Sequence, residues 1–183
     1  MKIGVTGSLS SGKSSVAKLL SKNKKLLFSA DQVVKNLYSD PNFKRKIKRK
    51  FKMKKKDLKA EIKSKILKKE ISLKELSMII HPLVRKKMRE FYKKNSKKKT
   101  LIFEVPLLIE SRLMDFFDFI ILVVAPRENR LRRYLKNGGQ KEMFTLLDKN
   151  QVSPRKKAKY CDYLIVNNKS KKLLKKRVDD ILG

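Results

Sequence analysis

Eight consecutive residues near the start of the chain have the types and spacing of a phosphate-binding loop. Residues 7–14 match the pattern G-x-x-x-x-G-K-[ST]. In such a loop successive backbone N–H groups face one anion, Lys13 can reach the β- and γ-phosphates of a nucleotide, and the Ser14 hydroxyl can bind Mg²⁺. The sequence therefore predicts a nucleotide-binding site formed by Gly7, Ser8, Leu9, Ser10, Ser11, Gly12, Lys13, Ser14 and Ser15.

The residues on both sides of the phosphate-binding loop favour this interpretation. Such a loop works only where a buried strand is followed directly by a helix. An apolar run at residues 3–5 precedes it, and residues 14–20 have the character of a helix. The alternative is a chance match in a serine-rich turn, which this context makes a poor explanation.

Two carboxylates lie at the carboxyl ends of other predicted strands. Ligands of open parallel sheets bind beyond the carboxyl ends of the strands, so we expect Asp31 to face the same crevice as Lys13. There Asp31 can accept a proton from an attacking hydroxyl; the alternative is a helix N-cap, and the two roles are compatible. Glu104 ends an apolar strand, where P-loop enzymes keep an acidic residue for Mg²⁺ or its waters, so we expect Ser14 and Glu104 to hold the metal.

Cations and apolar residues elsewhere suggest further parts of a site. Arg132 belongs to a basic stretch at residues 130–136 that resembles the lid of a kinase, where cations stabilise the moving phosphoryl group; the alternative is one more basic surface helix. Arg85 can bind a substrate phosphate, whereas the lone histidine, His81, is more often a capping residue than a catalyst. Leu107 and Leu108 follow Pro106 and are expected to line the floor of the cleft, although such leucines more often belong to the core.

Short apolar segments alternate with helical patterns, which predicts an α/β fold with a parallel sheet. The region 31–99 between the second and third strands is too long for one crossover helix, so we interpret it as a helical insertion that Pro41 and Pro82 break into at least three helices. Gly138–Gly139 predicts a turn between two later helices. The predicted strands are Lys2–Thr6, Leu26–Ser29, Thr100–Glu104, Phe119–Val124 and Tyr163–Val166.

The formal net charge of +33 on 183 residues would suit a polyanionic partner. Lysine far outnumbers arginine and is spread along the chain without interleaved aromatic residues, so we interpret it as solvated helix faces and do not expect a nucleic-acid partner. The single cysteine, Cys161, fits a reducing compartment, and no apolar run approaches the ~20 residues of a membrane span. With no leader sequence before the first strand, we expect a cytoplasmic protein that has no membrane association and is a monomer or weak oligomer.

Several separated motifs together resemble the dephospho-CoA kinase family. They are the phosphate-binding loop after Ile3-Gly4-Val5-Thr6, Ser29-Ala30-Asp31, His81-Pro82-Leu83-Val84, Val105-Pro106-Leu107-Leu108-Ile109-Glu110, and the segment from Gln151 to Asn167. The resemblance implies an ATP- and Mg²⁺-dependent kinase that phosphorylates the ribose 3′-hydroxyl of dephospho-CoA. It further implies one P-loop nucleoside-kinase-like domain with a five-stranded core (about 1–31, 100–126 and 162–183), a substrate-binding insertion (about 32–99) and a lid (about 127–155).

The resemblance also assigns roles to individual positions. Asp31 matches the family's proposed base, Lys13 its phosphate-binding lysine and Arg132 a lid arginine, while His81, Pro82 and Arg85 fall where dephospho-CoA is expected to bind. The chain departs from the family at Ser8 and Ser10, which replace glycines, and at Lys136, which replaces a second lid arginine. The competing interpretations are a kinase for another small alcohol or nucleoside monophosphate and a basic nucleic-acid-binding NTPase.

Overall fold

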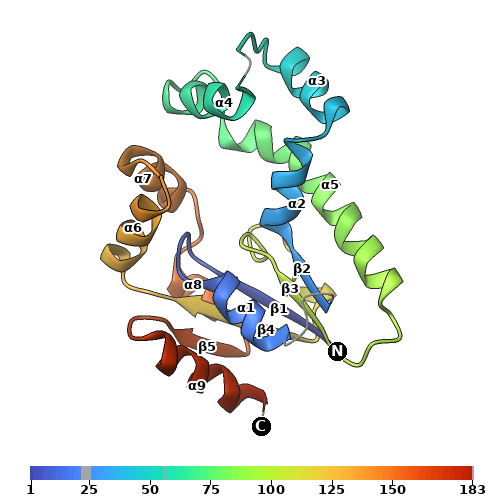
Figure 1. Cartoon of the computed structure of the whole chain (residues 1–183), viewed down its shortest axis with the longest axis vertical. Coiled ribbons are helices and arrows are strands. Elements are labelled where there is room, and N and C mark those ends of the chain that lie inside the picture. The colour runs from blue at the N-terminus through green and yellow to red at the C-terminus, as the bar shows by residue number, and fades with distance from the viewer. Residues whose placement is uncertain (22–25, 56, 183) are drawn as a thin grey trace. The chain divides into compact units, whose positions relative to one another are not determined.

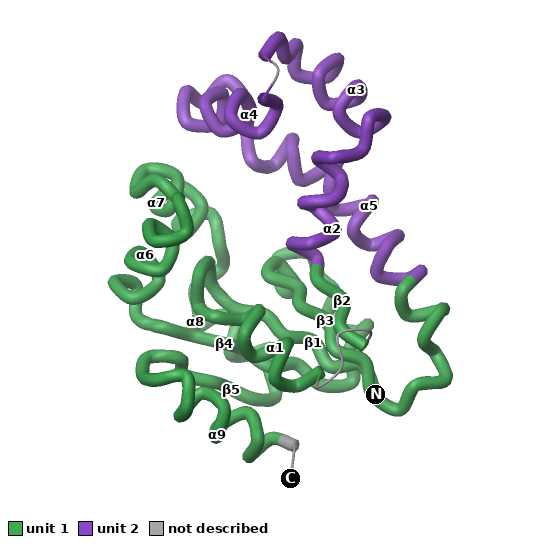
Figure 2. Tube along the Cα trace, in the orientation of Figure 1, with its two compact units in different colours: residues 1–29, 91–183 green, residues 30–90 purple. Residues whose placement is uncertain are grey.

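The chain forms two compact units in a computed structural model that describes residues 1–21, 26–55 and 57–182. One unit combines residues 1–29 with residues 91–183, and the other is continuous over residues 30–90 (Figure 2). The second unit overlaps the region 32–99 that the sequence marks as an insertion, but it begins at residue 30 and ends at residue 90. Each unit is described by itself below.

A five-stranded parallel sheet forms the centre of the first unit, which confirms the predicted fold class (Figure 1). Its order is β2-β3-β1-β4-β5, so the strand that precedes the phosphate-binding loop lies in the middle. The predicted strands agree with the observed ones to within one residue at each end, because strands covered on both faces stand out as apolar runs. The strands are β1 (Lys2–Gly7), β2 (Leu27–Ser29), β3 (Leu101–Glu104), β4 (Phe119–Val124) and β5 (Tyr163–Val166).

Two helices, α1 (Lys13–Ser21) and α9 (Lys171–Leu182), cover one face of this sheet (Figure 1). Val16, Ala17 and Leu20 of α1 recur at helical spacing and point into the core, where they are almost fully buried. They pack with alternate residues of the strands and with the buried stripe of α9. This packing fixes the direction of α1 as it leaves the phosphate-binding loop.

Aromatic rings fill the other face. Phe103 of β3 is fully buried, and its ring centroid lies 5.4–5.8 Å from four neighbouring phenylalanine rings. Gly4 of β1 makes room for this layer, since a Cβ there would lie 2.8 Å from Cδ1 of Leu108 and 3.1 Å from the ring of Phe117. The short 3-10 helix η2 (Met114–Phe116) contributes Phe116 to the same cluster.

The chain between β4 and β5 forms α6 (Arg127–Lys136), α7 (Lys141–Lys149) and α8 (Pro154–Ala158). We call residues 127–155 the lid segment. Gly138 and Gly139 lie between α6 and α7, as predicted. Gly138 has φ +78°, and a Cβ on Gly139 would lie 2.2 Å from the ring of Tyr134, so both positions favour glycine.

The second unit is helical: α2 (Ala30–Leu37), α3 (Pro41–Lys50), α4 (Leu58–Leu67) and most of α5 (Leu73–Lys94). Pro41 separates α2 from α3 as expected, because it occupies the first position of a helix whose N-cap, Asp40, accepts a hydrogen bond from Phe43 N (2.7 Å). The prediction that Pro82 would break the helix is wrong. Pro82 lies inside α5, where burial of Leu76 and Ile80 on one side of the proline and Met88 on the other offsets its cost of about 3 kcal/mol.

None of the helices in the described ranges has the length and apolar character needed to cross a membrane.

Candidate nucleotide-binding and catalytic site

The phosphate-binding loop joins β1 to α1, and α1 begins at Lys13. Gly7 has φ +148°, and a Cβ there would lie 2.1 Å from the carbonyl oxygen of Val123 at the end of β4. Gly12 has φ +101°, and its Cβ would lie 2.1 Å from Nδ2 of Asn167, just beyond β5. Two features therefore favour glycine at both positions: the backbone angle and the close neighbouring atom.

The two serines of the loop that depart from the family pattern differ in their backbone. Ser10 adopts the left-handed conformation, with φ +57°, which costs a residue other than glycine about 1–2 kcal/mol. Ser8 is not strained in this way; it is 2% exposed, and its carbonyl accepts a hydrogen bond from Nζ of Lys13 at 2.8 Å. Only Ser10 therefore adds strain to the loop.

Lys13 is 6% exposed and lies across its own loop toward Ser8. A buried ammonium group needs strong acceptors, and in the loop of residues 7–14 the natural one is a phosphate. This arrangement keeps the ammonium group of Lys13 beside the start of α1, where a helix N-terminus favours binding of a phosphate.

Glu104 connects three elements at the carboxyl edge of the sheet. Its Oε1 accepts a hydrogen bond from Oγ of Ser14 (2.5 Å), at the start of α1, and its Oε2 accepts one from Oγ of Ser29 (2.8 Å), at the end of β2. Glu104 is 3% exposed. The sequence predicted Ser14 and Glu104 as partners but gave Ser29 no role, although Ser29 ends a strand next to β3.

The pair formed by Ser14 and Glu104 fits Mg²⁺. The ion prefers hard oxygen ligands, takes one or two from the protein and completes its shell with waters and nucleotide phosphates. Among the described residues no three His, Cys, Asp or Glu side chains lie close enough together to form a metal site on their own. A site shared with a nucleotide is therefore the arrangement that these side chains suit.

Asp31 is the second residue of α2 and is exposed, two positions after Ser29. It lies inside the first helical turn and not at the N-cap position, which precedes the helix. Lys13 belongs to the first unit and Asp31 to the second. The expectation that both face one crevice stays a prediction.

His81 and Arg85 are half-buried, lie four residues apart on α5 and share one face of that helix; Pro82 is exposed. Their contact with a substrate stays a prediction. Leu108 is fully buried in the first unit, as its alternative role in the core implies, and Leu107 is half-buried.

The arginines that touch the phosphate-binding loop are neighbours of the one that the sequence singled out. Arg132 is exposed and donates a hydrogen bond to Oδ1 of Asn129 (2.9 Å), and its role at a phosphoryl group stays a prediction. Arg133 donates to the carbonyl oxygens of Ser11 (3.2 Å) and Asn167 (3.0 Å). Burial lowers the pKa of Arg133, and the nearby charge of Arg132 lowers it further.

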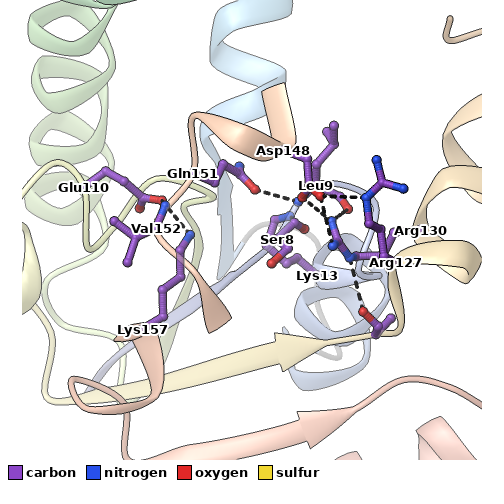
Figure 3. Close-up of polar contacts among 11 residues, drawn as sticks. Ser8, Leu9, Lys13, Glu110, Arg127, Arg130, Asp148, Gln151, Val152 and Lys157 are labelled. Atoms are coloured by element: carbon purple, nitrogen blue, oxygen red, sulfur yellow. Dashed lines mark hydrogen bonds and ion pairs between the residues drawn. The ribbon is translucent and has the colours of Figure 1, made fainter. Parts of the chain in front are cut away.

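Three polar residues that contact the loop or its arginines had no assigned role. Oε1 of Gln151 accepts a hydrogen bond from Leu9 N at 2.8 Å, and Asp148 pairs with Arg130 at 2.5 Å (Figure 3). Nδ2 of Asn167 donates to Ser11 O at 2.8 Å. The rule that placed Asp31 and Glu104, a polar residue directly after a strand, also finds Asn167; nothing local marks Gln151 or Asp148.

Cys161 is not a nucleophile. Burial, followed by the charge of Asp162, raises the pKa of its thiol to about 11, so the thiol stays protonated at neutral pH. Its Sγ donates to the carbonyl oxygen of Lys157 at 3.2 Å. These contacts support a structural role for Cys161.

The chain is similar over nearly its whole length to one group of proteins. The family model described as dephospho-CoA kinase matches residues 1–172. The dephospho-CoA kinase of Fusobacterium nucleatum is 34% identical over 98% of this chain and 95% of its own length. Among solved structures, TT1252 of Thermus thermophilus has a TM-score of 0.79 at 25% identity, covering 100% of this chain and 96% of that one. A dephospho-CoA kinase of Campylobacter jejuni shares the fold, with a TM-score of 0.66 at 23% identity and the same coverage of both chains.

Replacing Gly12 by alanine should disrupt the loop, and Gly138 offers a matched control. Both have positive φ, but a Cβ on Gly138 meets nothing within 4 Å. We expect Gly138→Ala to lower the free energy of unfolding by about 1 kcal/mol, and Gly12→Ala by about 3 kcal/mol because a steric clash is added to the backbone strain. Urea denaturation measures both, and equal losses would show that Asn167 does not restrict Gly12.

Proposed function

The chain belongs to the dephospho-CoA kinase family, and from this premise we propose how its residues transfer the γ-phosphoryl group of ATP to the ribose 3′-hydroxyl of dephospho-CoA. The protein is an ATP-dependent kinase with a P-loop fold. The observation that carries the assignment of residues is the contact of Ser14 with Glu104 at the carboxyl edge of the sheet, beside the start of α1.

The phosphate-binding loop holds the phosphates of ATP. Backbone N–H groups at the start of α1 face the anion, and Lys13 neutralises the β- and γ-phosphates. Mg²⁺, held by Ser14 and Glu104, would offset the charge of the phosphate oxygens. Ser29 orients the carboxylate of Glu104 from its other oxygen.

Asp31 accepts the proton of the ribose hydroxyl as this oxygen attacks the γ-phosphorus, the bond from that phosphorus to the β–γ bridging oxygen breaks, and ADP leaves. A phosphoryl transfer needs little else from the protein besides positioning and charge stabilisation. Arg132 supplies positive charge to the moving group. His81, Pro82 and Arg85 of α5 bind dephospho-CoA, with Arg85 directed to its phosphates, and Leu107 borders the acceptor site.

The lysine-rich surface supports capture of both anionic substrates, since a positive field raises association rates at low salt. The single cysteine cannot form an intramolecular disulfide and supports a reducing, cytoplasmic location.

An ADP-release assay with different acceptors tests the substrate. We expect turnover with dephospho-CoA to exceed that with nucleosides and nucleoside monophosphates by at least about 100-fold, because a site built to bind the whole acceptor loses binding energy with a truncated one. Higher turnover with a nucleoside monophosphate would overturn the assignment. Stimulation of ATP hydrolysis by RNA or DNA, without turnover of dephospho-CoA, would instead favour a nucleic-acid-dependent NTPase.

The variant Asp31→Asn tests the base. We expect kcat to fall by about 100-fold or more while the Kd for ATP changes little, because only proton transfer is removed. Asp180→Asn, at an exposed position of α9, is the matched control and should keep full activity. Lys13→Ala should lose both ATP binding and turnover; near-normal turnover of Asp31→Asn would remove Asp31 from the role of base.

The variant Glu104→Gln tests the metal site. Loss of the carboxylate charge should raise the Mg²⁺ concentration needed for half-maximal activity by at least about tenfold, since a neutral amide is a weaker ligand for a hard cation. Glu128→Gln, at an exposed position of α6, serves as control. An unchanged Mg²⁺ dependence in Glu104→Gln would contradict the site.

A further inference from the structure

Side chains of the lid segment bind the peptide groups of Leu9, in the middle of the phosphate-binding loop. Leu9 N donates to Oε1 of Gln151 at 2.8 Å, and Nη1 of Arg130 lies 3.4 Å from Leu9 O (Figure 3). The N–H and the carbonyl oxygen of Leu9 are thus both held by side chains of residues far along the chain. Neither contact is part of the phosphate chemistry described above.

The loop needs such support because its own backbone is strained. Ser10, directly after Leu9, has φ +57° where glycine would adopt this angle without cost. A residue stays in an unfavourable backbone region only where its surroundings impose it. The hydrogen bond from Leu9 N to Gln151 holds the Ser8–Leu9 peptide unit, and the contact of Arg130 with Leu9 O holds the next unit, which directly precedes Ser10.

Arg130 makes several contacts within the protein that anchor it beside the loop. It is 6% exposed and pairs with Asp148 through two contacts, at 2.5 Å and 3.3 Å, while the same carboxylate also pairs with Arg127 at 3.6 Å. Its Nε donates to Ala125 O at 3.2 Å, and its guanidinium lies 5.6 Å from the ring centre of Phe144. With its donors directed at these groups, Arg130 holds α6 and α7 to the loop.

Gln151 is itself held in place through the next residue. Val152 N donates to Oε1 of Glu110 (3.1 Å), which also pairs with Nζ of Lys157 at 2.8 Å. Lys157 is fully buried and donates to Pro106 O at 3.3 Å. The carboxamide of Gln151 therefore has a fixed backbone from which to reach Leu9.

We propose that Gln151 is a positioning residue for ATP: by accepting the Leu9 N–H it keeps the strained loop in its phosphate-binding conformation and couples that conformation to the lid segment. This inference rests on the proposed ATP site. It implies that Gln151 matters for nucleotide affinity and that its importance follows from the serine at position 10.

A double-mutant cycle with Ser10→Gly tests this coupling. We expect Gln151→Ala to raise the Kd for ATP about tenfold, the effect of losing one buried hydrogen bond, with kcat at saturating ATP within about twofold. In a Ser10→Gly background, where the loop is unstrained, the same change should raise Kd less than about threefold. Gln140→Ala, which removes an exposed glutamine that gives no cap to α7, should leave Kd unchanged.

Titration calorimetry with a non-hydrolysable ATP analogue measures each Kd, and thermal denaturation checks that each variant is folded. An unchanged Kd in folded Gln151→Ala, or an equal loss in both backgrounds, would overturn the proposal. Should Gln151→Ala not fold, Gln151→Asn, whose amide is one methylene shorter, serves in the same cycle with the same criteria. Lys13→Ala distinguishes a failure of the positioning role from a failure of the proposed ATP site. If Lys13→Ala loses ATP binding while Gln151→Ala keeps normal binding, only the positioning role of Gln151 fails. If Lys13→Ala still binds ATP, the proposed ATP site itself is overturned.

Discussion

The phosphate-binding loop packs closely against the carboxyl ends of β4 and β5 at Gly7 and Gly12, where no space is left for a side chain. At Gly7 the neighbour is a backbone carbonyl, which cannot turn away, and at Gly12 it is the amide of Asn167. This close approach places the loop at the carboxyl edge of the sheet, where helix and strand ends combine into an anion site. The start of α1, and with it Lys13 and Ser14, is set by these two contacts.

Ser14 can form part of the proposed metal site only because other strands end beside it. Glu104 lies between Ser14 and Ser29, and its carboxylate joins α1, β3 and β2 through two hydrogen bonds. The order β2-β3-β1 makes this possible, since it puts residues from three distant parts of the chain at one edge. A buried carboxylate is costly unless its oxygens are satisfied, and here hydroxyl groups satisfy them while leaving the charge available to a cation.

An element or site residue could be predicted from the sequence where a local pattern has one physical cause. Buried parallel strands are apolar runs, so β1 to β5 could be located in advance, and Glu104 with them because the carboxyl ends of such strands form the ligand edge. Lys13 and Ser14 could be located from the spacing of the phosphate-binding loop. The helix break predicted at Pro82 was wrong, because burial along α5 is a tertiary effect that no local rule contains. In the lid segment the sequence located the helix of arginines, but which arginines turn toward the loop depends on how α6 packs. Gln151 and Asp148 carry no local signal, because their partners Leu9 and Arg130 come from folding alone.

The contacts that complete the loop span most of the chain. Leu9 and Gln151 are 142 residues apart, and Ser11 and Asn167 are 156 apart. During synthesis the loop leaves the ribosome long before the segments that support it. Closing the chain over such separations costs conformational entropy before the contacts form, so we expect these supports of the nucleotide site to form late in folding. A nascent or truncated chain that lacks β5 has the whole nucleotide-binding motif and not the structure that makes it work.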